Sequence, residues 1–129
     1  MIKVHHIAIW CRDLEQMRLF YCRYFGFMQG EKYSSKTHPF TSYFLHHPGQ
    51  ESSMIELMHD PGMVHSNSEA ATGIAHLAFS TGSEENVRKV TEQLRKDGHT
   101  VVIEPRRTGD GYYESQVLDP EGNRIELTV

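Results

Sequence analysis

The sequence predicts an α+β fold of two βαβββ modules whose strands form a curved mixed sheet. Short apolar runs of strand length alternate with longer segments of helical spacing, and the order strand, helix, three strands occurs twice. The two copies also share residues at a constant offset of 70 positions. H-I-A-I at residues 6–9 returns as H-L-A-F at 76–79, and I-E-L at 55–57 returns unchanged at 125–127. Such an internal repeat indicates two copies of one supersecondary unit.

The first module opens with an apolar, β-branched run of strand length and continues into a helix. Asp13 is suited to cap the helix N-terminus, with Gln16 three residues later, and Gly26 lies where a glycine ends a helix. Polar stretches that contain Pro or Gly then separate three short strands. The predicted elements are a strand at 4–10, a helix at 14–25, and strands at 27–33, 41–45 and 54–59.

The second module repeats this order after a segment rich in Gly, Ser, Asn and Glu. Its helix shows apolar residues at helical spacing and is followed by Gly98. Its last two strands are joined by the turn sequence D-P-E-G-N. The predicted elements are a strand at 74–80, a helix at 83–97, and strands at 101–104, 112–118 and 124–129.

Length and composition indicate one domain over residues 1–129, with module 1 at about 1–65 and module 2 at about 70–129. The chain is 38% hydrophobic, and 13 Lys and Arg stand against 17 Asp and Glu. We expect no nucleic-acid partner because there is no basic excess, and no membrane span because no apolar run approaches ~20 residues. A cytoplasmic protein with reduced Cys11 and Cys22 is expected.

Two of the nine histidines and two glutamates occupy matching positions of the repeat. Side chains alternate along a strand, so His6 shares a face with Ala8, away from the face that the helix must cover. Glu56 lies on the same side by the same argument, and the offset of 70 assigns His76 and Glu126 the same orientation. We therefore expect the two pairs to converge on the concave side of the sheet.

Two carboxylates and two neutral imidazoles in a half-buried cup would carry a formal charge of -2. The two carboxylates would repel each other, which is costly away from water. A divalent cation would cancel this charge. Two nitrogen and two oxygen ligands suit zinc, nickel, cobalt, manganese or iron better than calcium or magnesium, and of these we expect zinc or nickel. The other interpretation is that all four are solvent-facing polar positions of strands that pack on helices.

The chain resembles the vicinal oxygen chelate superfamily, which includes glyoxalase I, methylmalonyl-CoA epimerase, extradiol dioxygenases and the fosfomycin and bleomycin resistance proteins. The resemblance covers nearly the whole chain. Its motifs are HHIAIWCRDLEQMRLFYCRYFGF, MIELM, GIAHLAFS and LDPEGNRIELTV. It implies metal ligands at His6, Glu56, His76 and Glu126, and this His/Glu/His/Glu pattern is that of the glyoxalase I branch.

The resemblance implies a metal-dependent lyase or isomerase that moves a proton between adjacent carbons of a small substrate with two neighbouring oxygens. Glu126 would act as the base, with Glu56 as the symmetric alternative. The alternatives are an epimerase of a 2-substituted thioester and a non-catalytic binding or resistance protein. A homodimer is also implied.

Four further residues are candidates for binding the substrate. Trp10 and Asp60 stand where glutathione-dependent relatives such as lactoylglutathione lyase have Arg and Asn. This departure from the pattern counts against glutathione itself as the thiol. Arg106 and Arg107, expected in a loop, could bind an anionic end of the substrate.

Overall fold

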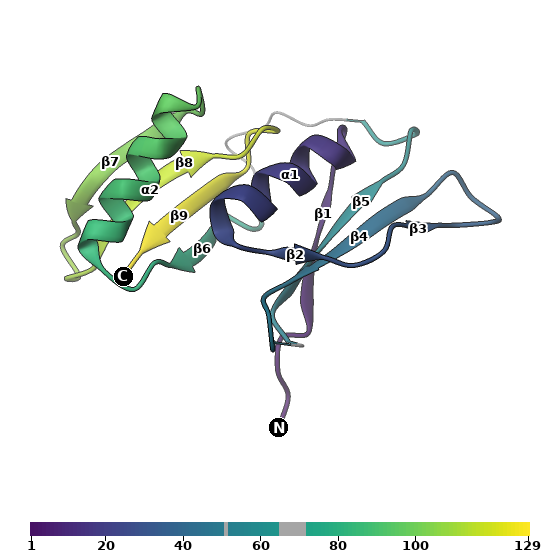
Figure 1. The fold of residues 1–129 in the computed structure, drawn as a ribbon, viewed down its shortest axis with the longest axis horizontal. Coiled ribbons are helices and arrows are strands. Elements are labelled where there is room, and N and C mark those ends of the chain that lie inside the picture. Colours follow the sequence, from purple (N-terminus) through teal and green to yellow (C-terminus); the bar gives the residue numbers. More distant parts are fainter. Residues whose placement is uncertain (51, 65–71) are drawn as a thin grey trace. The chain divides into compact units, whose positions relative to one another are not determined.

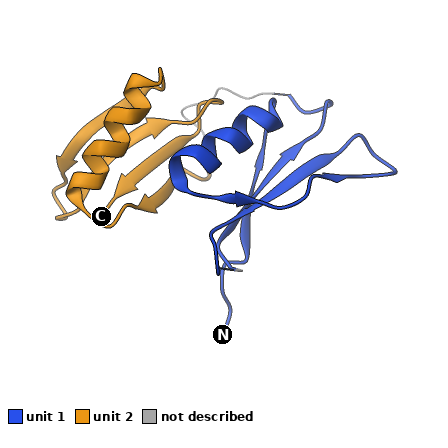
Figure 2. Ribbon diagram, in the orientation of Figure 1, with its two compact units in different colours: residues 1–67 blue, residues 68–129 orange. Residues whose placement is uncertain are grey.

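A computed structural model describes residues 1–50, 52–64 and 72–129. The chain divides into two compact units, Met1–Asn67 and Ser68–Val129 (Figure 2). The predicted module boundaries at about residues 65 and 70 lie outside the described residues. Each unit has one helix and one mixed sheet, which confirms the α+β prediction of two modules (Figure 1).

In unit 1 the sheet has the strand order β1-β5-β4-β2, and the short strand β3 also pairs with β4. Strands β1 and β5 run parallel, whereas β4 is antiparallel to its neighbours. The elements are β1 (His6–Trp10), α1 (Leu14–Phe25), β2 (Met28–Gln29), β3 (Tyr33–Ser34), β4 (Thr41–His46) and β5 (Met54–His59).

Unit 2 repeats this topology with the order β6-β9-β8-β7. Strands β6 and β9 are parallel, and the other neighbours are antiparallel. The elements are β6 (Leu77–Ser80), α2 (Glu84–Lys96), β7 (Val101–Arg107), β8 (Tyr113–Leu118) and β9 (Arg124–Thr128).

The strand register follows the offset of 70. Ala8 pairs with Glu56 in unit 1, and Ala78 pairs with Glu126 in unit 2. The residues that follow the two glutamates, Leu57 and Leu127, point to the other face of each sheet. Both are 0% exposed, because the helices cover that face. The faces that bear the two glutamates are therefore opposite the helix-covered faces, and we call each of them the open face.

Local signals in the sequence explain the helix ends. The Asp13 carboxylate accepts a hydrogen bond from the Gln16 amide at 2.9 Å, and Ser83 caps α2 through the Asn86 amide at 3.1 Å. Gly26 ends α1 with a φ of 68°, a left-handed conformation that glycine adopts without strain.

Two details of the predicted elements are wrong. The strand expected at 27–33 is divided into β2 and β3, because the chain leaves the ladder after Gly30. Strand β7 continues through Pro105 to Arg107 with two register shifts, so Arg106 and Arg107 lie in a strand and not in a loop. A proline is tolerated there because β7 is an edge strand.

Both cysteines are free thiols, as predicted, and burial raises the pKa of Cys22. Among the residues that the structure describes, no helix is long and apolar enough to cross a membrane.

Candidate metal centre

In unit 1 the predicted ligands His6 and Glu56 face each other across two parallel strands. The distance from His6 Nε2 to Glu56 Oε2 is 3.4 Å, and their side chains are 35% and 15% exposed. The other ring nitrogen, Nδ1 of His6, lies 2.8 Å from Nδ1 of His5. This contact orients the imidazole with Nε2 toward Glu56. A hydrogen bond to the second ring nitrogen orients metal-binding histidines in the same way.

In unit 2 the ligands His76 and Glu126 form the same pair. Nε2 of His76 lies 3.2 Å from Oε2 of Glu126, and the two side chains are 35% and 14% exposed, nearly as in unit 1. His76 directly precedes β6, and Glu126 lies in the middle of β9. The tight turn before β9 is fixed by the buried Asp119, whose Oδ1 accepts hydrogen bonds from the amides of Glu121 and Asn123, both at 2.9 Å.

The surroundings of Glu126 include a residue that the sequence analysis missed, Glu114 on β8. Burial raises the pKa of Glu114, and a hydrogen bond with Glu126 and the negative charges of Glu126 and Asp110 raise it further. Arg106 opposes this effect, because its positive charge favours the ionised carboxylate. The alternation along β8 could have revealed Glu114, since it shares a face with Gln116, which pairs with Glu126.

Trp10 and Asp60 occupy different environments in unit 1. Trp10 lies on the open face with His6 and Ala8 and is 47% exposed; its ring meets that of Phe40 edge to face at 6.2 Å. Asp60 follows β5, and its Oδ1 accepts a hydrogen bond from the Gly62 amide at 2.8 Å within its own turn.

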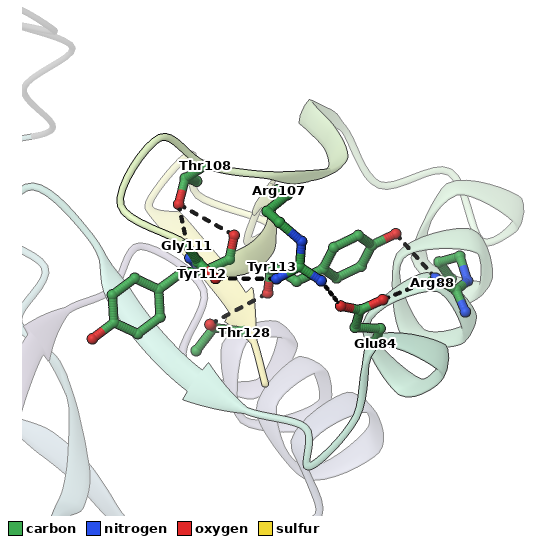
Figure 3. Close-up of polar contacts among 8 residues, drawn as sticks. All are labelled: Glu84, Arg88, Arg107, Thr108, Gly111, Tyr112, Tyr113 and Thr128. Atoms are coloured by element: carbon green, nitrogen blue, oxygen red, sulfur yellow. Dashed lines mark hydrogen bonds and ion pairs between the residues drawn. The ribbon is translucent and has the colours of Figure 1, made fainter.

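The two candidate arginines lie on opposite faces of β7. Arg106 pairs with Glu114 and so belongs to the open face, where Glu126 also lies. Arg107 pairs with Tyr113, on the side of α2. It forms an ion pair with Glu84 of α2, stacks over the Tyr113 ring at 5.7 Å and donates to the Gly111 carbonyl at 3.1 Å (Figure 3). Arg107 therefore does not share the face of Glu126.

The donor atoms present fit a divalent transition metal. Each pair offers one imidazole nitrogen and one carboxylate oxygen, the mixed donor set that such metals prefer. Each carboxylate is largely withdrawn from water, so a nearby cation would offset the cost of its charge. Within the described parts of the chain no group of three or more potential ligands occurs, and each unit brings two of the four predicted ligands together.

Residues 3–127 match the Glyoxalase/Bleomycin resistance protein/Dioxygenase superfamily, and the chain belongs to this superfamily. Among its relatives is the uncharacterized protein YwkD of Bacillus subtilis (strain 168). The two are 37% identical over 129 residues, which are 96% of this chain and 94% of YwkD.

Solved glyoxalase I structures share the fold. Glyoxalase I from Zea mays has a TM-score of 0.80 and 24% identity over 98% of this chain, which spans 44% of the maize chain. The trypanothione-dependent glyoxalase I of Leishmania major has a TM-score of 0.79 and 25% identity, with 99% of this chain and 86% of that chain covered.

Proposed function

We propose that the protein is a glyoxalase I-like, metal-dependent lyase or isomerase that moves a proton between adjacent carbons of a small substrate with two neighbouring oxygens. One observation carries the proposal. The same pair, His Nε2 against Glu Oε2, occurs in both units at 3.4 and 3.2 Å with nearly equal exposure. The repeated pairing of an imidazole nitrogen with a carboxylate oxygen supports a shared ligand role over four unrelated solvent-facing positions.

In this proposal His6, Glu56, His76 and Glu126 together hold one divalent metal, zinc or nickel. The bound cation supplies Lewis-acid stabilisation of the negative charge that develops on the substrate oxygens when a neighbouring C–H bond is broken. Bound by the four residues, the cation would also offset the negative charges of the two carboxylates.

Glu126 acts as the base, with Glu56 as the symmetric alternative. On a hemithioacetal of a 2-oxoaldehyde, Glu126 removes the proton from the carbon that bears sulfur and returns it to the adjacent carbonyl carbon. The hydroxyl proton moves to the second oxygen, so the product is a 2-hydroxy thioester and no oxidant or reductant is needed. Glu114, hydrogen-bonded to Glu126, positions this carboxylate.

Trp10 shares the open face of unit 1 with His6, Asp60 directly follows β5, and Arg106 lies on the open face of unit 2. We propose Trp10 and Arg106 as the substrate contacts of the two units. Asp60 would face a substrate group that donates a hydrogen bond, since it repels a carboxylate. Arg107 contributes less, because Glu84 and Tyr113 already engage it.

We also propose a homodimer in which each site combines a pair from one chain with a pair from its partner. Mixing the His6→Ala and His76→Ala proteins tests this arrangement. In a mixed dimer one of the two sites would keep all four ligands, so the isolated mixed dimer should bind about half as much metal as the wild type, and an equal mixture after random subunit exchange about a quarter. Sites completed within one chain would not be restored at all.

The activity is tested by NMR in D2O with zinc-loaded and nickel-loaded protein. The substrates are hemithioacetals formed from a 2-oxoaldehyde and either glutathione or a short alkyl thiol, and a 2-methyl thioester. Conversion of a hemithioacetal to a 2-hydroxy thioester supports the proposal, and exchange only at C2 of the thioester indicates an epimerase. Ligand binding without turnover or exchange overturns the proposal in favour of a binding protein.

A further inference from the structure

A row of side chains crosses the open face of unit 1 near the His6–Glu56 pair. The strand register aligns Tyr33 with Ser42, Ser42 with Met58, and Met58 with Trp10. Phe40 joins the two ends of this row, because its ring lies 6.2 Å from that of Trp10 and 6.0 Å from that of Tyr33. We call Trp10, Phe40 and Tyr33 the aromatic row.

The aromatic row remains accessible, although its rings touch. Trp10 is 47% exposed and Tyr33 is 56% exposed, whereas the aromatic residues Phe20 and Tyr21 of α1 are 3% and 0% exposed. Phe20 and Tyr21 thus belong to the buried core under the helix, whereas Trp10 and Tyr33 do not. Rings that contact one another and still expose this much surface can gain stabilisation by covering a ligand.

The aromatic row lies one step along the sheet from the candidate ligand Glu56. Glu56 pairs with Ala8, which is two residues before Trp10 on the same face. Two residues of a strand span roughly 7 Å. In a molecule whose oxygens lie at the His6–Glu56 pair, the oxygen-bearing carbon, two or three methylene groups and half the width of a six-membered ring together span about this distance.

The surface between the pair and the aromatic row is uncharged. It consists of Ala8, Phe44 and Met58, and the Phe44 ring meets the His6 ring edge to face at 5.2 Å. The cations Arg18 and Lys32 lie on the other face of the sheet, where both stand over the Tyr43 ring and form ion pairs with Glu15, at 2.9 and 3.1 Å. An apolar tail over Ala8, Phe44 and Met58 would be desolvated at little cost, whereas an anionic tail would lose hydration there.

We infer that the substrate carries an apolar, ring-sized group two or three methylene groups from its vicinal oxygens, and that Trp10, Phe40 and Tyr33 bind this group. The inference rests on the proposed function for the position of the oxygens. The contact of the apolar group with the aromatic row does not depend on a metal.

Trp10 is the only tryptophan of the chain, so its fluorescence reports directly on the aromatic row. Three probes are titrated into full-length protein, with affinities taken from calorimetry. In the zinc-loaded protein, 3-phenylpropanohydroxamate and acetohydroxamate present the same vicinal oxygens with and without the ring. In metal-free protein, 3-phenylpropanol presents the ring without the chelating group.

The phenyl hydroxamate should bind about tenfold or more tightly than acetohydroxamate and change the Trp10 emission, because its ring is buried. Phe40→Ala and the more exposed Tyr33→Ala should each remove most of this advantage without changing the affinity for acetohydroxamate. Tyr112→Ala, which truncates a 60% exposed ring in unit 2, is the matched control and should leave the advantage intact.

The outcomes separate the two proposals. Equal affinity of the two hydroxamates with unchanged Trp10 emission overturns the aromatic-row inference and leaves the metal centre standing. If the protein takes up no zinc, the metal centre fails; a change of Trp10 emission by 3-phenylpropanol that Tyr33→Ala abolishes then still supports the aromatic row. No response to 3-phenylpropanol in that case overturns both.

Discussion

The two units share one topology and one pair of candidate ligands, but the side chains around the pair differ in kind. The register aligns β1, β5 and β4 of unit 1 with β6, β9 and β8 of unit 2, so positions on their open faces can be compared directly. Apolar residues of unit 1 correspond to polar residues of unit 2: Trp10 to Ser80, Met54 to Arg124, Phe44 to Gln116, and Met58 to Thr128.

This difference favours different roles for the two units in the proposed reaction. The His–Glu pair is the part that both units keep, as the proposed four-ligand site requires. The apolar surroundings of Glu56 suit the binding of an uncharged tail. The polar surroundings of Glu126, with Glu114 in hydrogen-bond contact, suit the exchange of a proton.

The strongest test of this division compares Glu126→Gln with Glu56→Gln. We expect Glu126→Gln to lower the rate of substrate deuterium exchange by about 10²- to 10⁴-fold, the usual contribution of a general base, and Glu56→Gln to have a smaller effect. NMR in D2O measures the rate, and the metal content of each variant controls for lost binding. A larger loss in Glu56→Gln would reverse the assigned roles.

The equivalence of the two cores is tested at Leu57 and Leu127, which are both 0% exposed and separated by the repeat offset. Each Leu→Ala change should lower the free energy of unfolding by about 2–5 kcal/mol through lost contacts and a cavity. Urea denaturation measures the loss. Leu19→Ala, at a 56% exposed position, is the control and should change stability by less than about 0.5 kcal/mol. A negligible effect at only one site would show that the cores are not equivalent.

The unit 2 core contains a buried hydroxyl pair. Thr91 donates to the Val87 carbonyl at 2.6 Å, so Ser115 must donate to Thr91, at 2.7 Å. Thr91→Val should cost about 1–3 kcal/mol because the Ser115 hydroxyl loses its acceptor. Adding Ser115→Ala should recover part of this loss in thermal unfolding. A double variant that is less stable than Thr91→Val would contradict the hydrogen-bond explanation.

The smallest effect concerns Glu15 and Glu85, which are the second residues of the two helices and are separated by the repeat offset. Burial alone would raise the pKa of Glu15, but hydrogen bonds from Arg18, Lys32 and Tyr43 hold it below its ordinary value. Glu85 has a lowered pKa through Lys89. Glu15→Gln should cost about 1 kcal/mol or less, since the side chain is partly exposed, and Glu85→Gln should cost less still.

The pH dependence follows from the direction of the Glu15 shift. Because the folded pKa lies below the unfolded value near 4.5, the contribution of Glu15 is fully present above that pH and is lost as the pH falls through the folded pKa. The wild type and Glu15→Gln should therefore differ in urea midpoint at pH 7 and converge in acid. A difference that grows in acid would contradict the sign of the shift.

Much of the fold could be predicted from periodicity, helix caps and the constant offset. The two His–Glu pairs were also predicted, because strand alternation fixes the face of a residue and the repeat fixes its partner. Alternation along β8 gives the face of Glu114, but its contact with Glu126 also depends on the register between β8 and β9, which the sequence does not supply. The opposite faces of Arg106 and Arg107 likewise depend on β7 continuing past Pro105.

The central claim is that both pairs bind one metal. Elemental analysis of tag-free protein, purified without added metal or chelator and then supplied with zinc or nickel, tests it directly. We predict about one transition metal per chain in the wild type and in His38→Ala, an exposed histidine outside both pairs, and loss of the metal in His6→Ala and in His76→Ala. A wild type that binds no metal, or a His76→Ala protein that keeps it, would contradict the claim.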